Sequence, residues 1–329
     1  MLEIGKDKQL YTIKNEKIIK LDENDLDKIK EILKKFEIEL SQENPALKFL
    51  YRGENLEKIK SKLNSSGLDE TFYKVFKLGE KPNSLFISSN KNNSNELYRV
   101  DCVNDDMFRD IFNKINKILI NESTPKLKKF IENNKEFDEY FKDLDNIEDF
   151  IEKINLSNAK LLLKDYYMAF LHTEGNIIHD KSYFLSTSEK FDIAKKFSLN
   201  SNPDNQIVFG YFISKPFLLY GIFHKNKGYL TKLIKKCNLV SYSALHKKEE
   251  EFSIRGGFLP HYILYVKLKE KRKEKYIINP FIFVDEYNVD TNLNEGFPVD
   301  QENFIDEIRE TNYNGYIEHN DGGITQNDL

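Results

Sequence analysis

Apolar residues recur at helical spacing through much of the first half of the chain. Over residues 25–40 they lie three or four positions apart, which predicts an amphipathic helix that ends before Pro45. The same spacing predicts further helices at 107–119, 127–141, 147–154 and 159–172. The stretch from about 104 to 173 therefore reads as a continuous helical block.

From residue 182 onward, short apolar or alternating runs indicate strands instead. We expect strands at 182–185, 206–214, 249–254, 261–269 and 276–284. In the first half, residues 9–21 alternate around Asn15 and predict a short hairpin, and residues 49–51 form a candidate buried strand. A helix-rich half followed by a strand-rich half predicts an α+β fold with antiparallel sheets rather than alternating βαβ units.

The composition excludes several classes of protein. Of the 329 residues 40% are hydrophobic, including 25 Phe and 18 Tyr, which is enough for a sizeable core and rules out wholesale disorder. Two cysteines, Cys102 and Cys237, provide neither a disulfide framework nor a structural zinc cluster. The most apolar run, 216–223, is far shorter than the roughly 20 residues of a membrane span. No secretory signal is visible, so we expect a cytoplasmic protein or one delivered into a target cell by another route.

Charge is distributed unevenly along the chain. The formal net charge is −4, which argues against a protein that simply coats nucleic acid. Residues 285–329 nevertheless hold twelve acids and one base, so residues 1–284 carry +7. The acidic segment is either a solvated tail or a segment that covers a basic cleft or binds a basic partner.

Several common catalytic and phosphate-binding motifs are absent. The chain has no GxGxxG and no GxxxxGK[ST] sequence, so neither Rossmann nor P-loop phosphate binding is indicated. Its six histidines form no HExxH motif and no helical i, i+4 pair. We therefore expect no metal site, and interpret each histidine as a surface or core residue.

Three short segments carry the candidate chemistry, and the first is FLYRGE at 49–54. It brings Arg52 and Gly53 to the end of an apolar run. Arginine is planar, always charged and forked, which suits a phosphate or ribose contact, and glycine lets a ligand approach the backbone closely. The structural alternative is an ordinary arginine at the end of a strand.

The second segment, YFLSTSEKFDIAKKFS at 183–198, places Ser186, Thr187 and Ser188 between a short strand and a predicted helix. Small hydroxyl groups at the end of a strand can hold a sugar and orient a neighbouring carboxylate. Ser186 followed three residues later by Glu189 also matches a helix capping box, so these residues have a structural interpretation as well.

The third segment is KKEEEFSIRGG at 247–257. If residues 249–254 form a strand, Glu249 and Glu251 lie on one face, roughly 7 Å apart. Two carboxylates in this arrangement could divide the work of stabilising a cation and activating a nucleophile. The structural alternative is a solvated run of charges at the end of a loop.

In this order and setting, the YRG, STS and ExE motifs resemble those of the ADP-ribosyltransferase superfamily. The chain is most similar to the Arg–Ser–Glu branch, which includes the clostridial and cholera-type toxins. The resemblance is detailed over about 183–268 and rests on a single motif at 49–54. It implies one ADP-ribosyltransferase-like domain over 1–329, with a core of two packed antiparallel sheets and a helical N-terminal part.

The chain departs from the family pattern in one respect. Arg52 and Ser186 are 134 residues apart, much further than is usual in the family. The helical block at about 104–173 would then be an insertion, for example a target-recognition lobe. Arg99, in the sequence ELYRV, is the alternative motif arginine, but no glycine follows it and we favour Arg52.

The resemblance implies NAD as substrate, no metal, and a set of NAD-binding residues. Arg52 would contact the NAD phosphates, and the Gly53 backbone would contact the nicotinamide amide. Ser186 would position the nicotinamide ribose and the catalytic glutamate, with Thr187 and Ser188 completing the motif. The remaining NAD contact would come from Phe197, which would flank the nicotinamide ring.

The resemblance also assigns the two glutamates different roles. Glu251 would be the catalytic glutamate, and Glu249 would act on the side of the acceptor. In the family an ExE motif goes with arginine acceptors. The expected function is therefore mono-ADP-ribosylation of a protein arginine, by a bacterial toxin or effector for which an antitoxin or inhibitor would be a natural partner.

Three alternatives stay open beside this expectation. A transferase that modifies RNA or DNA is compatible with the +7 charge of residues 1–284. An NAD glycohydrolase would use the same residues without an acceptor. In a non-catalytic interaction protein, the helical block would carry the function and the motifs would be coincidental.

Overall fold

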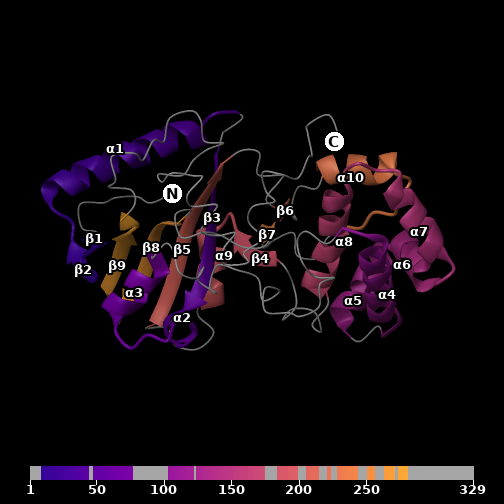
Figure 1. Ribbon diagram of the computed structural model, residues 1–329, viewed down its shortest axis with the longest axis horizontal. Coiled ribbons are helices and arrows are strands. Elements are labelled where there is room, and N and C mark those ends of the chain that lie inside the picture. The colour runs from indigo at the N-terminus through magenta and orange to yellow at the C-terminus, as the bar shows by residue number, and fades with distance from the viewer. Residues whose placement is uncertain are drawn as a thin grey trace. The chain divides into compact units, whose positions relative to one another are not determined.

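The computed structural model describes residues 9–43, 47–76, 103–121, 124–174, 184–198, 205–214, 221–223, 228–243, 250–255, 263–270 and 273–280. The chain divides into two compact units, which are described separately below (Figure 1). The first unit comprises residues 1–86, 186–218 and 258–313, and the second comprises 87–185, 219–257 and 314–329. The predicted helical block at 104–173 falls entirely within the second unit.

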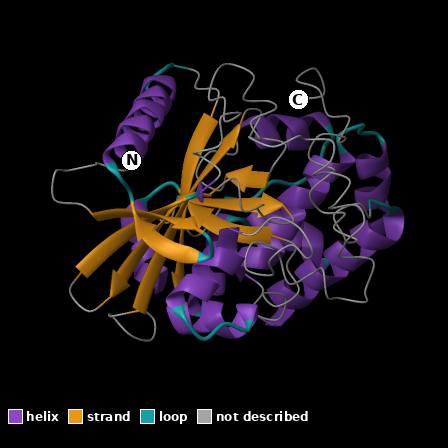
Figure 2. Ribbon diagram, turned by 60° about the vertical axis from the view of Figure 1, so that its left-hand side comes forward, coloured by secondary structure: helices purple, strands orange, loops and turns teal. Residues whose placement is uncertain are grey.

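The first unit is built on a sheet whose twist is visible in Figure 2. Its strands occur in the order β2-β1-β9-β8-β5-β3-β4. They are β1 (Gln9–Lys14), β2 (Lys17–Lys20), β3 (Leu47–Asn55), β4 (Phe184–Ser188, of which 186–188 fall in this unit), β5 (Asn205–Ser214), β8 (Ile263–Glu270) and β9 (Lys273–Ile278). Their described pairings are antiparallel except that of β1 with β9, which is parallel.

The α+β class is therefore correct, but the arrangement of the strands differs from the prediction. The first unit contains one mixed sheet rather than two packed antiparallel sheets. The N-terminal hairpin makes this sheet mixed, because it adds β1 alongside β9 in the same direction. Strand pairing between segments this far apart leaves no trace in local hydrophobic periodicity.

The hairpin predicted around Asn15 is confirmed. Strands β1 and β2 pair from Tyr11 with Lys20 to Lys14 with Lys17. Asn15 and Glu16 have φ values of 49° and 62°, the left-handed pair that a two-residue hairpin turn requires. Strands β8 and β9 form a second antiparallel pair, which ends at Glu270 opposite Lys273.

Four described helices belong to the first unit. They are α1 (Glu23–Leu40), α2 (Leu56–Leu63), α3 (Leu68–Phe76) and α9 (Phe191–Ser198). The helix predicted at 25–40 is confirmed as α1, whose Ile29, Leu33 and Phe36 are buried. Helix α2 begins at a side-chain cap, since Asn55 Oδ1 accepts hydrogen bonds from the backbone of Glu57 at 2.9 Å and Lys58 at 3.2 Å.

The second unit is mainly helical. Its described elements are α4 (Asp105–Asn121), α5 (Pro125–Asn133), α6 (Lys135–Lys142), α7 (Asn146–Asn155), α8 (Lys160–Glu174), α10 (Gly228–Lys236), and the strands β6 (Gly221–Phe223) and β7 (Glu251–Arg255). The single helix predicted at 127–141 is in fact α5 and α6. Asn134 separates them, and its side chain donates to Phe130 O at 2.8 Å and accepts from Ser243 N at 2.7 Å.

Helix α8 lies within the aromatic core of the second unit. Three tyrosines tie it to the segment that follows α10. Tyr167 donates its hydroxyl to Val240 O at 2.9 Å, and Tyr242 donates to Tyr166 O at 2.9 Å. Tyr166 Oη accepts from Tyr242 N at 2.7 Å. These bonds satisfy polar groups that would otherwise be costly to bury in so apolar a core.

Several predicted strands have different boundaries in the structure, and the one predicted at 276–284 is β9, Lys273–Ile278. Glu250 has a φ of 46°, so β7 begins at Glu251 and not at Glu249. The strand predicted at 182–185 is β4, Phe184–Ser188. The acidic segment 285–329 lies outside the described residues. Among the helices that are described, none combines the length and apolar character of a membrane span.

Candidate functional site

The structure brings together two of the three sequence motifs. Arg52 Nη1 donates to the backbone oxygen of Ser186 at 2.6 Å. Beside this contact, Tyr51 on β3 pairs with Ser188 on β4. The YRG and STS motifs are therefore neighbours within the first unit, although 134 residues separate them in the sequence.

Arg52 also takes part in a cluster of charges. Its Nη2 donates to Glu54 Oε1 at 2.6 Å, and Lys58 Nζ lies 3.8 Å from Glu54 Oε2. The Glu54 side chain is only 6% exposed. Burial alone would raise the pKa of Glu54, but the positive charges of Arg52, Lys58 and Lys62 outweigh it and hold that pKa below its ordinary value. Three bases thus surround one acid, so the cluster has a net positive charge that favours anions.

This cluster predicts a pH-dependent contribution to stability. A carboxylate whose pKa is lowered by folding stabilises the native state above its unfolded pKa of about 4.3. That contribution is lost as the pH falls through the pKa that Glu54 has in the folded protein. We therefore expect Glu54→Gln to lower the free energy of unfolding by about 1–3 kcal/mol at pH 7, and by much less at pH 3.

Urea unfolding of both proteins at the two pH values measures this effect. The Lys58 side chain is 59% exposed, so Lys58→Gln serves as a surface control with an expected change below about 1 kcal/mol. A Glu54→Gln effect of the same size at pH 3 and pH 7 would show that the ion pair does not contribute.

Gly53 has a packing role in the structure. A Cβ atom added to it would lie 1.7 Å from the backbone oxygen of Ala194 and 2.9 Å from Ser198 N. Helix α9 therefore rests directly on β3 at this residue. The close backbone approach that the sequence suggested is made by the protein's own helix.

The STS motif sits at the end of β4. Thr187 and Ser188 are buried, and Ser186 is half-buried. The capping-box interpretation of Ser186 is wrong, because Ser186 lies in the strand and α9 begins only at Phe191. Ser188 supports the turn instead, since its Oγ accepts from Lys190 N at 3.1 Å.

Glu189 and Phe197, also in the second segment, have other surroundings than the STS motif. Glu189, the expected capping partner, forms an ion pair with Lys48 on β3. Phe197 is on α9 with 54% of its surface exposed. An exposed phenylalanine is available to a ligand, in contrast to Ala194 on the same helix, which is buried against the sheet.

Glu251 belongs to the second unit and is held by two neighbours. Its Oε1 accepts a hydrogen bond from Ser253 Oγ at 3.0 Å and lies 3.4 Å from His172 Nε2. The exposed fractions are 12% for the Glu251 side chain and 5% for that of His172. The carboxylate is therefore fixed both by its own strand and by the last turn of α8.

Sequence reasoning missed the contact between His172 and Glu251. His172 stands in an apolar helix with no metal-ligand spacing, and nothing in the sequence pairs it with a distant glutamate. Two other candidates, Glu249 and Arg99, lie outside the described residues. The proposed sharing of one strand face by Glu249 and Glu251 is therefore not described.

The described residues contain no group of three or more His, Cys, Asp or Glu side chains arranged to hold a metal ion. In the first unit, the arrangement offers a positively charged cluster beside the STS strand. In the second, it offers a fixed carboxylate. Comparison of the chain with family models, with curated proteins and with solved structures found no match.

Proposed function

We propose that the protein is a mono-ADP-ribosyltransferase that transfers ADP-ribose from NAD to a protein arginine. The observation that carries the proposal is the 2.6 Å contact between Arg52 and Ser186. The motif order alone suggested that these residues act together. Their contact supports this interpretation, because it places the arginine of the first motif directly beside the serine of the second.

In the proposed mechanism, Arg52 binds the diphosphate of NAD. Arginine presents a fork of N–H donors that matches phosphate oxygens, and the neighbouring Lys58 and Lys62 add to the positive potential. Its Nε is buried and makes no hydrogen bond to a described residue. Ser186 would position the nicotinamide ribose. Phe197 has an exposed ring, but α9 packs on the sheet face that Gly53 presents, opposite to the Arg52 side chain, so only the family resemblance assigns Phe197 to the nicotinamide.

Glu251 has the catalytic role. As the bond from ribose C1′ to nicotinamide breaks, nicotinamide leaves with the electron pair and positive charge develops on the sugar. A carboxylate hydrogen-bonded to the ribose 2′-hydroxyl stabilises that charge. Ser253 and His172 hold Glu251 in one position, and such preorganisation is what electrostatic catalysis requires. The acceptor nitrogen then bonds to C1′ and loses its proton, for which Glu249 is the proposed base.

One structural observation favours a second candidate, a non-catalytic interaction protein. The bonds from Arg52 to Glu54 and to the Ser186 backbone are also those of an arginine that ties two strands together. In that case the function would lie in the helical second unit. The two candidates differ in whether the protein consumes NAD.

The test uses the full chain with adenylate-labelled NAD and a cell lysate, followed by protease or nuclease digestion. We expect released nicotinamide and a macromolecular label that resists nuclease and is lost with protease. A nuclease-sensitive label would assign the acceptor to nucleic acid. Nicotinamide without label would indicate an NAD glycohydrolase, and neither product would support the non-catalytic candidate.

A further inference from the structure

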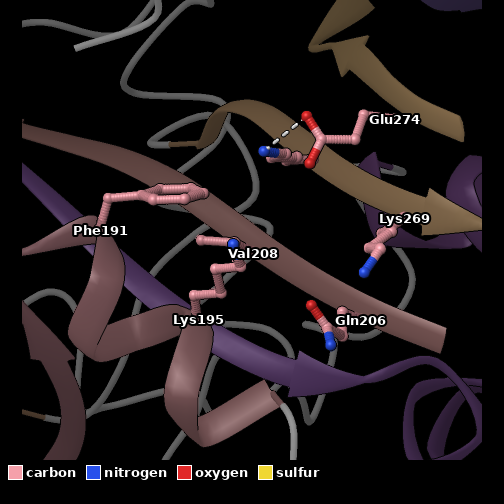
Figure 3. A pocket seen from close by; sticks show the side chains of 7 residues that line it. Phe191, Lys195, Gln206, Val208, Lys269 and Glu274 are labelled. Atoms are coloured by element: carbon pink, nitrogen blue, oxygen red, sulfur yellow. Dashed lines mark ion pairs between the residues drawn. The ribbon is translucent and has the colours of Figure 1, made fainter. Parts of the chain in front are cut away.

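A shallow hollow in the first unit lies beside α9, over strands β5, β8 and β9 (Figure 3). It is small, with about 220 Å³ of space including the open solvent at its mouth. It combines three lysines with one acid, one amide and two apolar side chains. The lining residues are Phe191, Lys195, Gln206, Val208, Lys267, Lys269 and Glu274.

Strand register separates this hollow from the Arg52 cluster. Arg52 pairs with Phe209, whereas the next residue, Gly53, pairs with Val208, which in turn pairs with Lys267. Paired residues share a face of the sheet, and consecutive residues point to opposite faces. The side chain of Arg52 and the lining of the hollow are therefore on opposite faces.

The hollow carries excess positive charge. Glu274 pairs with Lys267 at 2.9 Å, and Lys267 Nζ lies 5.0 Å from the ring centre of Phe191. Lys267 is thus neutralised and held in place. Lys195 and Lys269 form no ion pair with any described residue, so two positive charges at the hollow are uncompensated within the described part of the chain.

A buried amide faces the same space. Gln206 is 4% exposed, yet its side chain makes no hydrogen bond to a described residue. Its strand partner is Lys269, whose ammonium group points toward Gln206 from the neighbouring strand (Figure 3). Its amide atoms are not among the fully buried polar atoms that lack a partner, so the amide meets solvent at the hollow and is accessible to a ligand there. A ligand with acceptor oxygens would accept a hydrogen bond from the Gln206 amide.

We propose that the hollow binds a phosphate or diphosphate group of a small phosphorylated molecule. Two lysines act as point charges for the phosphate oxygens, and the Gln206 amide donates a directional hydrogen bond. The hollow is open and short, so it presents a local pair of positive charges to one phosphate or diphosphate group at its surface, whereas a nucleic-acid strand needs an extended basic track. This site is independent of the proposed NAD reaction.

The first test is lysine footprinting of the full chain with acetic anhydride and mass spectrometry, using inorganic pyrophosphate as the probe. We expect pyrophosphate to slow acetylation of Lys195 and Lys269 at least threefold. Lys196, which is exposed on the same helix but does not line the hollow, is the internal control and should react at an unchanged rate. Equal rates at Lys195 and Lys269 with and without pyrophosphate would overturn the proposal.

Calorimetry of pyrophosphate binding provides the second test. The double variant Lys195→Gln/Lys269→Gln should bind at the hollow at least tenfold more weakly than the wild type, whereas Lys196→Gln should bind within twofold of it. Gln206→Met keeps the volume and removes the amide, and should weaken binding severalfold. Wild-type affinity in the double variant, or tighter binding of a single-stranded oligonucleotide that competes with pyrophosphate, would refute the assignment.

Discussion

Replacing Glu251 with glutamine should reduce nicotinamide release from NAD by roughly 10²–10³-fold, equivalent to about 3–4 kcal/mol of transition-state stabilisation. Glutamine has nearly the same shape but carries no charge, so it cannot stabilise a developing sugar cation as a carboxylate does. Its side-chain oxygen can still accept the hydrogen bond that Ser253 now donates to Glu251. Chromatographic quantification of nicotinamide under steady-state conditions measures the change.

The matched comparison is Glu249→Gln, which alters a neighbouring carboxylate with a different assigned role. It should retain slow NAD hydrolysis and lose transfer to the acceptor. Circular dichroism and urea unfolding control for misfolding of either variant. Nicotinamide release at the wild-type rate by Glu251→Gln would remove the mechanism, and equal loss of both activities in Glu249→Gln would mean that this residue has no acceptor-specific role.

The long amphipathic elements were predictable because each has a buried face that repeats over many residues. Helices α1 and α4 lie where apolar spacing placed them, at 25–40 and 107–119. The short helices α2, α3 and α10 were missed. An eight-residue helix such as α2 buries only Leu56 and Ile59, and two positions do not establish a period. Tertiary contacts and caps determine such helices.

Parts of the candidate site could be predicted because their motifs are contained in short stretches of sequence. A strand carrying Arg52 and a strand carrying the STS motif were visible locally, and the family resemblance supplied the expectation that they act together. The partners of these residues could not be predicted. Glu54 and His172 gain their roles through burial and through pairing across the fold, and neither belongs to a local pattern.

The left-handed Glu250 illustrates the limit of pattern reasoning most clearly. The run of three glutamates at 249–251 precedes apolar residues and predicts the start of a strand, in which alternate side chains would point to the same face. A φ of 46° at Glu250 interrupts the extended backbone, so alternation holds only from Glu251 onward. A single backbone dihedral angle can therefore set the start of a strand that the residue pattern places earlier.

Replacing Gly53 with alanine is expected to destabilise the first unit strongly. The new methyl group would lie 1.7 Å from the backbone oxygen of Ala194, and a backbone atom cannot move aside as a flexible side chain does. Helix α9 would have to separate from β3 or the strand would have to bend. We expect a loss of more than about 3 kcal/mol in the free energy of unfolding, above the usual range for overpacking. Urea unfolding measures this loss.

Gly67→Ala is the matched control, because an added Cβ there meets no atom within 4 Å. It precedes α3, where exchange of glycine for alanine should cost less than about 1 kcal/mol. If Gly53→Ala were as stable as Gly67→Ala, α9 could not rest on β3 as described. A large loss at Gly53 alone would explain this glycine by helix packing, so that evidence for an NAD site must then come from the charged residues and not from YRG as a motif.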